Sequence, residues 1–344
     1  MKADRLTWFT RSLLRALGAG SWILILLVVF MAGWEIWGAG RPQSSPSAKS
    51  QGSWSKKAPL LTKRAEVGIA ALDGKIYVVG GATPGDQASP LNQEYDPASD
   101  RWRDRAPLPH GLSHPGVATL NHKLYAIGGF SGGGVHVGAL DLVFEYDPAM
   151  NVWRSLVPLS SPRGSVGVAV VDGKIHVIGG RGLDKVTVPT HQVYDPSTGK
   201  WTEAAPLPTA RDHMGVIVVD GKIHVIGGRT AGTSDNINLH DVYDPATNSW
   251  RSAAPLLTAR SSGAAAFYRG QILYAGGECN DGKTFSENEA YDPKTNQWVA
   301  LAPLPPGRHA FGAAGLGDYA YFTGGALGCG GGSLSDELLA FKLP

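Results

Sequence analysis

A chain of 344 residues can hold one large domain or two ordinary ones, and its 46 Gly and 23 Pro indicate many short strands joined by tight turns. With 43% hydrophobic and 17% charged residues, the composition excludes an intrinsically disordered protein. The formal net charge is +2, and residues 1–40 account for all of it. The rest of the chain is neutral and gives no electrostatic reason to expect nucleic acid as a partner.

The N-terminal segment has the pattern of a membrane anchor. Residues 1–15 contain four basic side chains and are predicted to form a cytoplasmic tail, because basic residues that flank an apolar segment stay in the cytoplasm. No charged residue occurs from Ala16 to Trp34, and a helix of this length rises about 28 Å, close to the thickness of a bilayer's hydrocarbon core. We therefore expect a transmembrane helix within residues 16–38, followed by a flexible linker at residues 39–52.

A cleavable signal peptide is the alternative interpretation of the same segment. Gly38, Ala39 and Gly40 offer the small residues that a signal peptidase requires, although the apolar run is long for a signal peptide. Both interpretations place the rest of the chain outside the cytoplasm. The first predicts a single-pass membrane protein with a periplasmic or extracellular domain, and the second predicts a secreted protein.

Six repeats fill the remainder of the chain. A Gly-Gly doublet returns every 48 to 51 residues, and a Trp precedes each doublet by 26 residues. A Tyr-Asp-Pro tripeptide begins seven residues before five of the six Trp. The doublets begin at Gly80, Gly128, Gly179, Gly227, Gly276 and Gly324, and the Trp residues are Trp54, Trp102, Trp153, Trp201, Trp250 and Trp298. This regularity indicates a fold built from one repeated unit.

Each unit is predicted to form four short strands. In the third unit, the apolar run from Val166 to Val171 is followed by Asp172-Gly173, the signal of a type I′ hairpin, and by a second apolar strand that ends in the doublet. A longer loop leads to a third strand that ends at Tyr-Asp-Pro, where repeated Asp residues are typical of turns. A tight turn then leads to a fourth strand, which contains the Trp.

The doublet, the Tyr and the Trp at these offsets resemble the Kelch motif, and the resemblance covers residues 54–344. It implies blades of a β-propeller, which a period near 50 residues with four strands per unit also indicates. We therefore expect an all-β, six-bladed Kelch β-propeller over residues 53–344. The motif is specific for the fold and carries little information on function.

The two ends of the predicted propeller complement each other. After the last doublet the chain reaches Phe341, where other units have Tyr, and has no Trp strand beyond it. The segment from Trp54 to Leu60 matches the corresponding segment from Trp201 to Leu207. The N-terminal strand is therefore expected to complete the last blade, which closes the ring and removes exposed sheet edges.

Strand order places the long, variable loops and the links between blades on one face, where function is more often found. Five of the six links carry an Arg five residues after a Pro, and the sixth carries Leu112. We expect these residues to surround the mouth of the central channel, either as a binding site for a carboxylate, phosphate or acidic peptide or as structural bonds within the loops. The five are Arg64, Arg163, Arg211, Arg260 and Arg308.

Less regular residues near these arginines are the better functional candidates. They are Glu66, His114, Asp212, His213 and His309. His176 and His224 are predicted to be packing residues, because they stand where other units have Tyr or Leu. His136, His191 and His240 are predicted to lie in loops of three different blades and have no short metal-ligand spacing, so we predict no metal and no cofactor. Cys279 and Cys329 lie in loops of adjacent blades and are candidates for a disulfide or for two unpaired thiols.

The expected function is binding rather than catalysis. We predict a membrane-anchored scaffold outside the cytoplasm that binds a protein, or an anionic or carbohydrate ligand, with its long-loop face. The alternative is a sugar-acid-active enzyme, because bacterial N-acetylneuraminate epimerase is a similar exported six-bladed Kelch protein whose pocket uses Arg and acidic residues. Galactose oxidase is a Kelch-like propeller too, but neither Cys lies in a version of its copper site. No catalytic residue is predicted.

Overall fold

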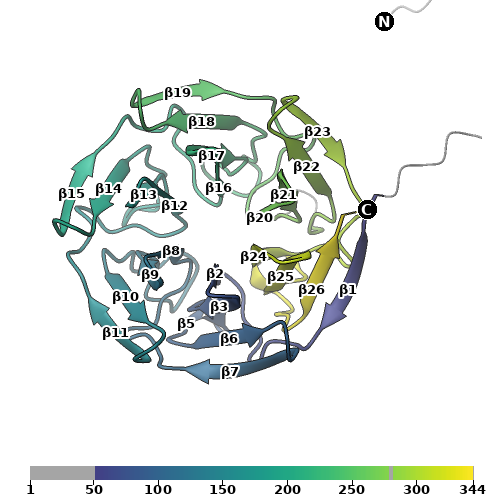
Figure 1. Ribbon diagram of the computed structural model, residues 1–344, viewed down its shortest axis with the longest axis horizontal. Coiled ribbons are helices and arrows are strands. Elements are labelled where there is room, and N and C mark those ends of the chain that lie inside the picture. The colour runs from purple at the N-terminus through teal and green to yellow at the C-terminus, as the bar shows by residue number, and fades with distance from the viewer. Residues whose placement is uncertain (1–50, 279–281, 344) are drawn as a thin grey trace, which may run out of the picture. The chain divides into compact units, whose positions relative to one another are not determined.

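The computed structural model describes residues 51–278 and 282–343, and these form six four-stranded antiparallel sheets arranged around a central channel (Figure 1). The all-β six-bladed propeller predicted from the repeats is confirmed. The tail, the segment at residues 16–38 and nearly all of the predicted linker lie outside the described residues. Within the described part, no helix is long and apolar enough to span a membrane.

Each blade takes its four strands from one continuous stretch of the chain, except that the last blade takes its outer strand from the N-terminal side. Blade 1 contains β2 (Gly68–Leu72), β3 (Lys75–Val79), β6 (Asn92–Asp96) and β7 (Arg101–Arg105). Blade 2 contains β8 (Gly116–Leu120), β9 (Lys123–Ile127), β10 (Val143–Asp147) and β11 (Val152–Ser155). Blade 3 contains β12 (Gly167–Val171), β13 (Lys174–Ile178), β14 (His191–Asp195) and β15 (Lys200–Glu203).

The second half of the ring follows the same order. Blade 4 contains β16 (Gly215–Val219), β17 (Lys222–Ile226), β18 (His240–Asp244) and β19 (Ser249–Ser252). Blade 5 contains β20 (Ala264–Tyr268), β21 (Gln271–Ala275), β22 (Asn288–Asp292) and β23 (Gln297–Ala300). Blade 6 contains β24 (His309–Leu316), β25 (Tyr319–Ala326), β26 (Leu338–Lys342) and β1 (Ser53–Lys57). A two-residue pair, β4 (Ala82–Thr83) and β5 (Gln87–Ala88), lies in the blade 1 loop, and a short 3-10 turn spans Cys329–Gly331.

The N-terminal strand closes the ring. β1 pairs with β26 in antiparallel register, and this pairing sets Trp54 opposite Phe341. The Trp54 indole donates to the carbonyl of Ala302 in the neighbouring blade at 3.0 Å, and each of the other five repeat Trp residues makes the equivalent bond. The predicted closure is therefore confirmed, and each Trp ties its blade to the preceding one.

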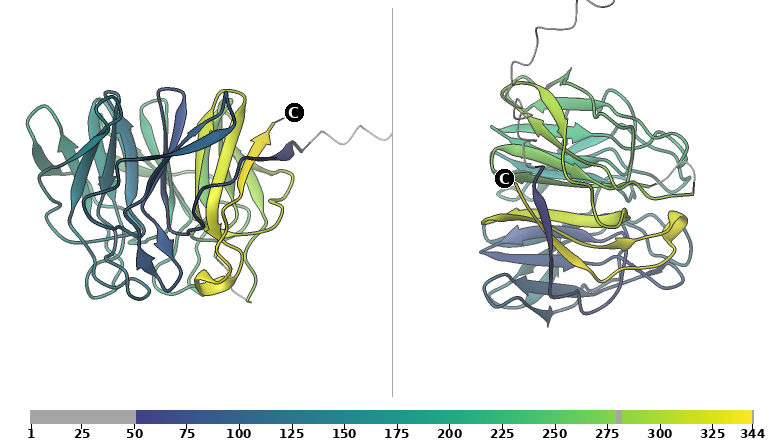
Figure 2. Two further views of the ribbon diagram at one scale, coloured as in Figure 1. Left: turned by 90° about the horizontal axis from the view of Figure 1, so that it is seen from below. Right: turned by 90° about the vertical axis from the view of Figure 1, so that its right-hand side faces the viewer.

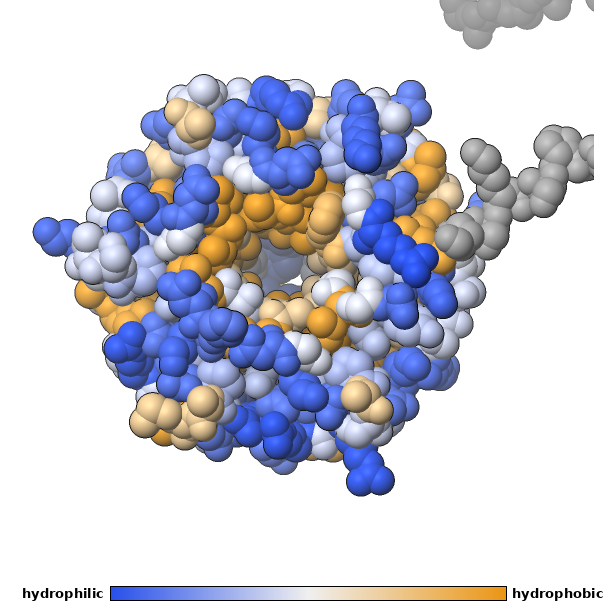
Figure 3. Space-filling view, viewed as in Figure 1, coloured by the Kyte–Doolittle hydropathy of each residue, from blue (hydrophilic) through white to orange (hydrophobic). Residues whose placement is uncertain are grey.

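The second and third strands of each blade form the core because neighbouring blades cover both of their faces. β13 and β14 are buried over four consecutive residues, whereas the outer strand β15 is largely exposed. The first strands line the channel, and Figure 3 shows its opening surrounded by apolar side chains on the face of the short turns. The long loops project from the opposite face, as the side view in Figure 2 shows.

The glycine doublet allows each blade to approach the next one closely. Gly128 and Gly129 have φ of 61° and 112°, and the Gly129 amide donates to the Arg163 carbonyl of the next blade at 3.0 Å. A Cβ atom on Gly128 would lie 2.3 Å from that same carbonyl oxygen. The doublet is thus required both for its backbone conformation and for the contact between blades.

Two buried histidine pairs occupy the middle of blades 3 and 4. His176 Nδ1 lies 2.9 Å from His191 Nε2, and His224 Nδ1 lies 2.8 Å from His240 Nε2. Burial lowers the pKa of His176, His191 and His224 to about 4 and that of His240 to about 3. His176 and His224 are packing residues, as predicted. His191 and His240 begin third strands rather than lying in loops.

These pairs predict an acid-sensitive fold. In the unfolded chain these histidines become protonated near pH 6.5, whereas in the folded protein they stay neutral down to about pH 4. The free energy of unfolding is therefore highest above pH 6.5 and falls as the pH decreases toward 4. Each histidine contributes up to about 1.4 kcal/mol per pH unit. Blade 5 has Leu273 and Asn288 at the two positions, and replacing all four histidines with this Leu–Asn combination should flatten the curve. Urea unfolding from pH 7.5 to 4.5 measures this, and identical slopes for both proteins would contradict it.

Candidate functional site

Six residues, one from each blade link, form a closed ring around the long-loop end of the channel. Each backbone amide donates to the carbonyl of the equivalent residue in the preceding blade, over 2.6 to 3.4 Å. All six have positive φ, between 53° and 59°, which is unusual for residues other than glycine. The ring consists of Glu66, His114, Ser165, His213, Ser262 and Ala310. It includes three of the predicted candidates, Glu66, His114 and His213, and a cavity of about 110 Å³ lies against it.

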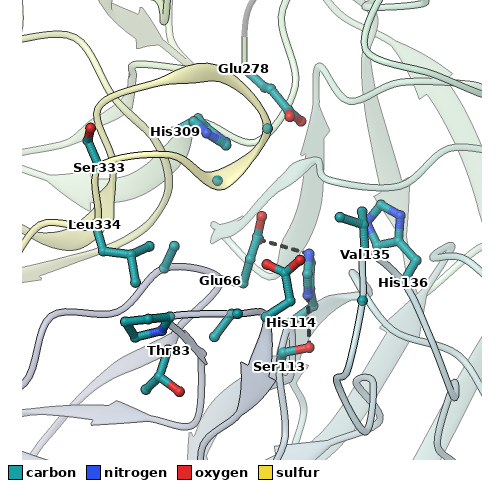
Figure 4. Close-up of a pocket in the computed structure, with 18 of the residues that line it drawn as sticks. Glu66, Thr83, Ser113, His114, Val135, His136, Glu278, His309, Ser333 and Leu334 are labelled. Carbon is teal, nitrogen blue, oxygen red and sulfur yellow. Dashed lines mark hydrogen bonds and ion pairs between the residues drawn. The ribbon is translucent and has the colours of Figure 1, made fainter.

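A larger cavity of about 440 Å³ opens beside this ring, among the long loops. Figure 4 shows Glu66, His114, His136, Glu278 and His309 around it, contributed by four different blades. Loop residues such as Thr83, Val135 and Leu334 form its outer wall. The predicted location of the site on the variable face agrees with this pocket.

Glu66 and His114 form the first polar pair of the pocket. His114 Nε2 lies 3.2 Å from a Glu66 carboxylate oxygen, and His114 Nδ1 lies 3.2 Å from the Ser113 hydroxyl (Figure 4). Burial alone would raise the pKa of Glu66, but the His114 imidazole, with His213 and His309 farther away, outweighs burial and holds that pKa below its usual range. Glu66 is therefore an anion inside the pocket.

A second, fully buried network surrounds Asp212. Its carboxylate accepts hydrogen bonds from His213 Nδ1, from Arg181 Nε at 2.7 Å and from Arg229 Nε at 3.2 Å. Arg229 also pairs with Glu278. Burial would raise the pKa of Asp212, but its cationic and imidazole neighbours, His213 first, keep it below its usual range. Both arginines are thereby occupied by carboxylates.

His136 completes a cluster of three imidazoles with His114 and His213. Their ring centroids are 5.0 to 5.2 Å apart, and one nitrogen from each lies within 4.8 Å of the others. Burial, together with His213 and His114, lowers the pKa of His136 to about 2, and burial with the nearby Arg229 lowers that of His213. The His136 imidazole is therefore neutral at physiological pH.

The five link arginines lie inside the blades rather than at the channel mouth, where we expected them. All five are completely buried. Arg64 and Arg260 each donate to one carbonyl of their own second strand and to the carbonyl of the doublet glycine that follows it, and Arg260 pairs with Glu289 at 2.6 Å. Arg163, Arg211 and Arg308 bind Gln192, Asp241 and Glu337 in the same way. The geometry matches the structural alternative, because each guanidinium joins a blade's inner link to its third strand or to the loop just before it.

Leu112 and His309 complete the predicted set. Leu112 replaces the arginine in blade 2 and packs with Phe144, which replaces the polar partner. His309 lines the pocket and its Nε2 lies 3.0 Å from the Gly328 carbonyl oxygen. Cys279 lies outside the described residues, so the disulfide with Cys329 stays a prediction.

Four site residues were not predicted from the sequence. Arg181, Arg229 and Glu278 directly follow a glycine doublet, and each forms an isolated bridge with the residue that follows the link arginine or its equivalent. That fixed offset is a signal that could have identified them. His136 lies in a loop without a repeated register, so nothing in the sequence placed it beside His114 and His213.

Comparison with known proteins agrees with this architecture. A family model described as the KLHDC2/KLHL20/DRC7 Kelch-repeats domain matches residues 117–325, and the Kelch motif matches residues 63–109. The chain belongs to the Kelch-repeat family. Kelch-like protein 35 is 30% identical in mouse and 46% identical in human over 129 residues, which cover 38% of this chain and 21% of those proteins. The chain thus matches about a fifth of the length of these Kelch relatives.

Two further comparisons support the Kelch fold. Zebrafish Kelch-like ECH-associated protein 1A is 51% identical over 35 residues, which cover 10% of this chain and 6% of that protein. The solved structure of YjhT superimposes with a TM-score of 0.71 at 18% identity, covering 83% of this chain and 97% of YjhT. At that identity the likeness concerns the fold alone.

Proposed function

We propose that this chain is a membrane-tethered Kelch propeller, held outside the cytoplasm, that binds a partner protein with its long-loop face. The apolar, uncharged segment within residues 16–38, preceded by a basic tail, supports the tether and the orientation. The observation that carries the binding role is a group of exposed apolar side chains on the long loops. They are Val135, Val137, Leu183, Val186 and Leu327, exposed by 38 to 66%.

The loops that present these side chains are joined to one another. Gln87 of blade 1 forms a bridge with Gly132 of blade 2, and the Gly133 amide donates to the Asp86 carbonyl at 3.0 Å. The Thr187 hydroxyl of blade 3 donates to the Thr230 carbonyl of blade 4 at 2.8 Å. A surface ordered before binding loses less conformational entropy when a partner docks.

The charges in the pocket do not favour the anionic ligand expected from the sequence. The link arginines are buried inside the blades, and Arg181 and Arg229 are bound to Asp212 and Glu278. An incoming carboxylate or phosphate would have to displace an existing carboxylate. A protein surface that covers the apolar loop residues has no such cost.

Site-specific crosslinking tests this proposal in cells. A photoreactive amino acid at Leu183, which is 66% exposed on the long-loop face, should give one discrete crosslinked product. The same amino acid at Met150, which is 71% exposed at the opposite face, should not. Adding Val186→Asp to the Leu183 probe should reduce the product at least about fivefold, because burial of the apolar loop surface is lost.

The same product tests the location. Protease added to intact cells or spheroplasts should degrade it, because the propeller is outside the cytoplasm. Equal crosslinking from Leu183 and Met150 would reject the long-loop face as the binding surface. A product that survives external protease until the membrane is lysed would reject the orientation.

A sugar-acid-active enzyme is the second candidate. The Glu66–His114 and Asp212–His213 pairs are arrangements that can move protons, which favours this alternative over other enzyme classes. Accelerated anomer exchange of N-acetylneuraminate by the purified protein, followed by NMR, would support the enzyme and not the scaffold.

A further inference from the structure

We propose that His114, His136 and His213 bind a divalent transition-metal ion, with the Glu66 carboxylate as the fourth ligand. The inference is independent of the partner-binding role, since it rests on the geometry of four side chains. These residues come from the links before blades 1, 2 and 4 and from the long loop of blade 2, and they converge where the channel meets the pocket.

The distances suit a small coordination sphere. Two ligands of a tetrahedral zinc ion are separated by about 3.3 Å, given metal–ligand bonds of about 2.0–2.1 Å. His114 Nε2 and the Glu66 oxygen already lie 3.2 Å apart. The three imidazoles present nitrogens within 4.8 Å of one another, so binding requires their separations to shorten by up to about 1.5 Å.

Hydrogen bonding prepares His213 for coordination. Asp212 accepts a hydrogen bond from His213 Nδ1, so the proton is fixed there and the lone pair is on Nε2. A buried carboxylate behind a histidine is the usual orienting contact of metal ligands. Arg229 Nη2 lies 3.2 Å and the Ser165 hydroxyl 3.3 Å from His213 Nε2, and a bound ion must displace both contacts. Arg229 retains Asp212 and Glu278.

His136 is available for a ligand. Within the described residues its ring makes contacts with Phe130, His114 and His213 but no hydrogen bond, although the residue is only 8% exposed.

The charge and the donor type select the metal class. Three buried or half-buried carboxylates, Glu66, Asp212 and Glu278, face two guanidinium groups, Arg181 and Arg229. The excess negative charge favours a cation. Imidazole nitrogens suit zinc, copper, nickel and iron rather than magnesium or calcium, and one carboxylate with three imidazoles suits Zn²⁺.

A cobalt titration of the untagged full-length protein, washed with chelator beforehand, tests the site. We expect one equivalent of Co²⁺ to bind with the strong visible absorption of four-coordinate cobalt, and one equivalent of Zn²⁺ to abolish the absorption. His136→Ala should weaken Co²⁺ binding more than about a hundredfold, because loss even of a residue that only orients a ligand costs 10–100-fold. Glu66→Gln should change the absorption spectrum and weaken binding at least about tenfold.

His122→Ala is the matched control. This histidine is an exposed imidazole that pairs with Asp73 on the short-turn face, and its loss should leave the titration unchanged. A thermal melt verifies that each variant is folded, and His136→Asn replaces His136→Ala if the alanine variant is unstable. The proposal is overturned if the wild type takes up no stoichiometric Co²⁺, if folded His136 variants bind as the wild type does, or if His122→Ala abolishes binding.

Discussion

Removal of residues 41–60 is expected to abolish cooperative folding of the propeller. The deletion takes away β1, whose five residues pair with β26, and exposes the edge of blade 6. It removes the partly buried Trp54, which packs on Phe322 and Phe341 at centroid distances of 5.1 and 4.7 Å, and the loss of about 3–5 kcal/mol for a fully buried Trp is its upper bound. It also removes Ala58, the acceptor of the Trp102 indole in blade 1.

The closure prediction has a simple control. Removal of residues 41–50 alone, which leaves β1 intact, should not change the midpoint of the thermal melt. Both deletions are measured by circular dichroism and calorimetry on the otherwise full chain. An unchanged cooperative melt after loss of residues 41–60 would show that the ring does not need its N-terminal strand.

Arg260→Leu is expected to destabilise the protein by about 3–5 kcal/mol, the usual effect of removing one partner of a buried ion pair. The substitution leaves Glu289, which is 2% exposed, without its 2.6 Å partner. It also removes the donor to the carbonyls of Tyr274 and Gly276. Denaturant unfolding measures the change in the free energy of unfolding.

Blade 2 provides the rescue for this variant. It has Leu112 and Phe144 at the positions of Arg260 and Glu289, so Arg260→Leu combined with Glu289→Phe should recover more than half of the loss. Arg103→Ala is the surface control: its side chain is 63% exposed, and loss of its pair with Glu94 should cost less than about 1 kcal/mol. A single Arg260→Leu variant as stable as Arg103→Ala would contradict the structural role of the link arginines.

The fold could be predicted because it is encoded six times. A doublet, a Tyr and a Trp at constant offsets define the strands. The last unit ends after Phe341 without a Trp strand, and the segment at Trp54 supplies that strand, so the sequence also shows how the ring closes. The direction of the arginine side chains could not be predicted. The sequence places Arg64 and Arg260 in links between blades. The guanidinium points into the blade because it binds neighbouring carbonyls and a partner on the third strand, and the sequence does not show these contacts.

The candidate site was predicted in part. Glu66, His114 and His213 share one repeat position, so a shared location followed from the repeat, and the structure places all three in one ring. The position of His136 depends on the path of a loop whose length differs between blades. The repeat therefore does not predict where this side chain lies. The metal hypothesis therefore arises from the structure alone.

In the ring of six backbone hydrogen bonds, the backbone groups support the channel mouth, whereas the side chains determine what the mouth can bind. Its bonds use only amide and carbonyl groups, so the side chains above them are free to differ, and the ring tolerates Glu, His, Ser and Ala. Proline is excluded at each position because it would remove the donating amide, and β-branched residues are disfavoured there by the positive φ. New specificities can therefore evolve, or be engineered, by exchanging these side chains without rebuilding the propeller. A library that varies Ser165, Ser262 and Ala310 would explore this freedom while the acidic and imidazole residues stay in place.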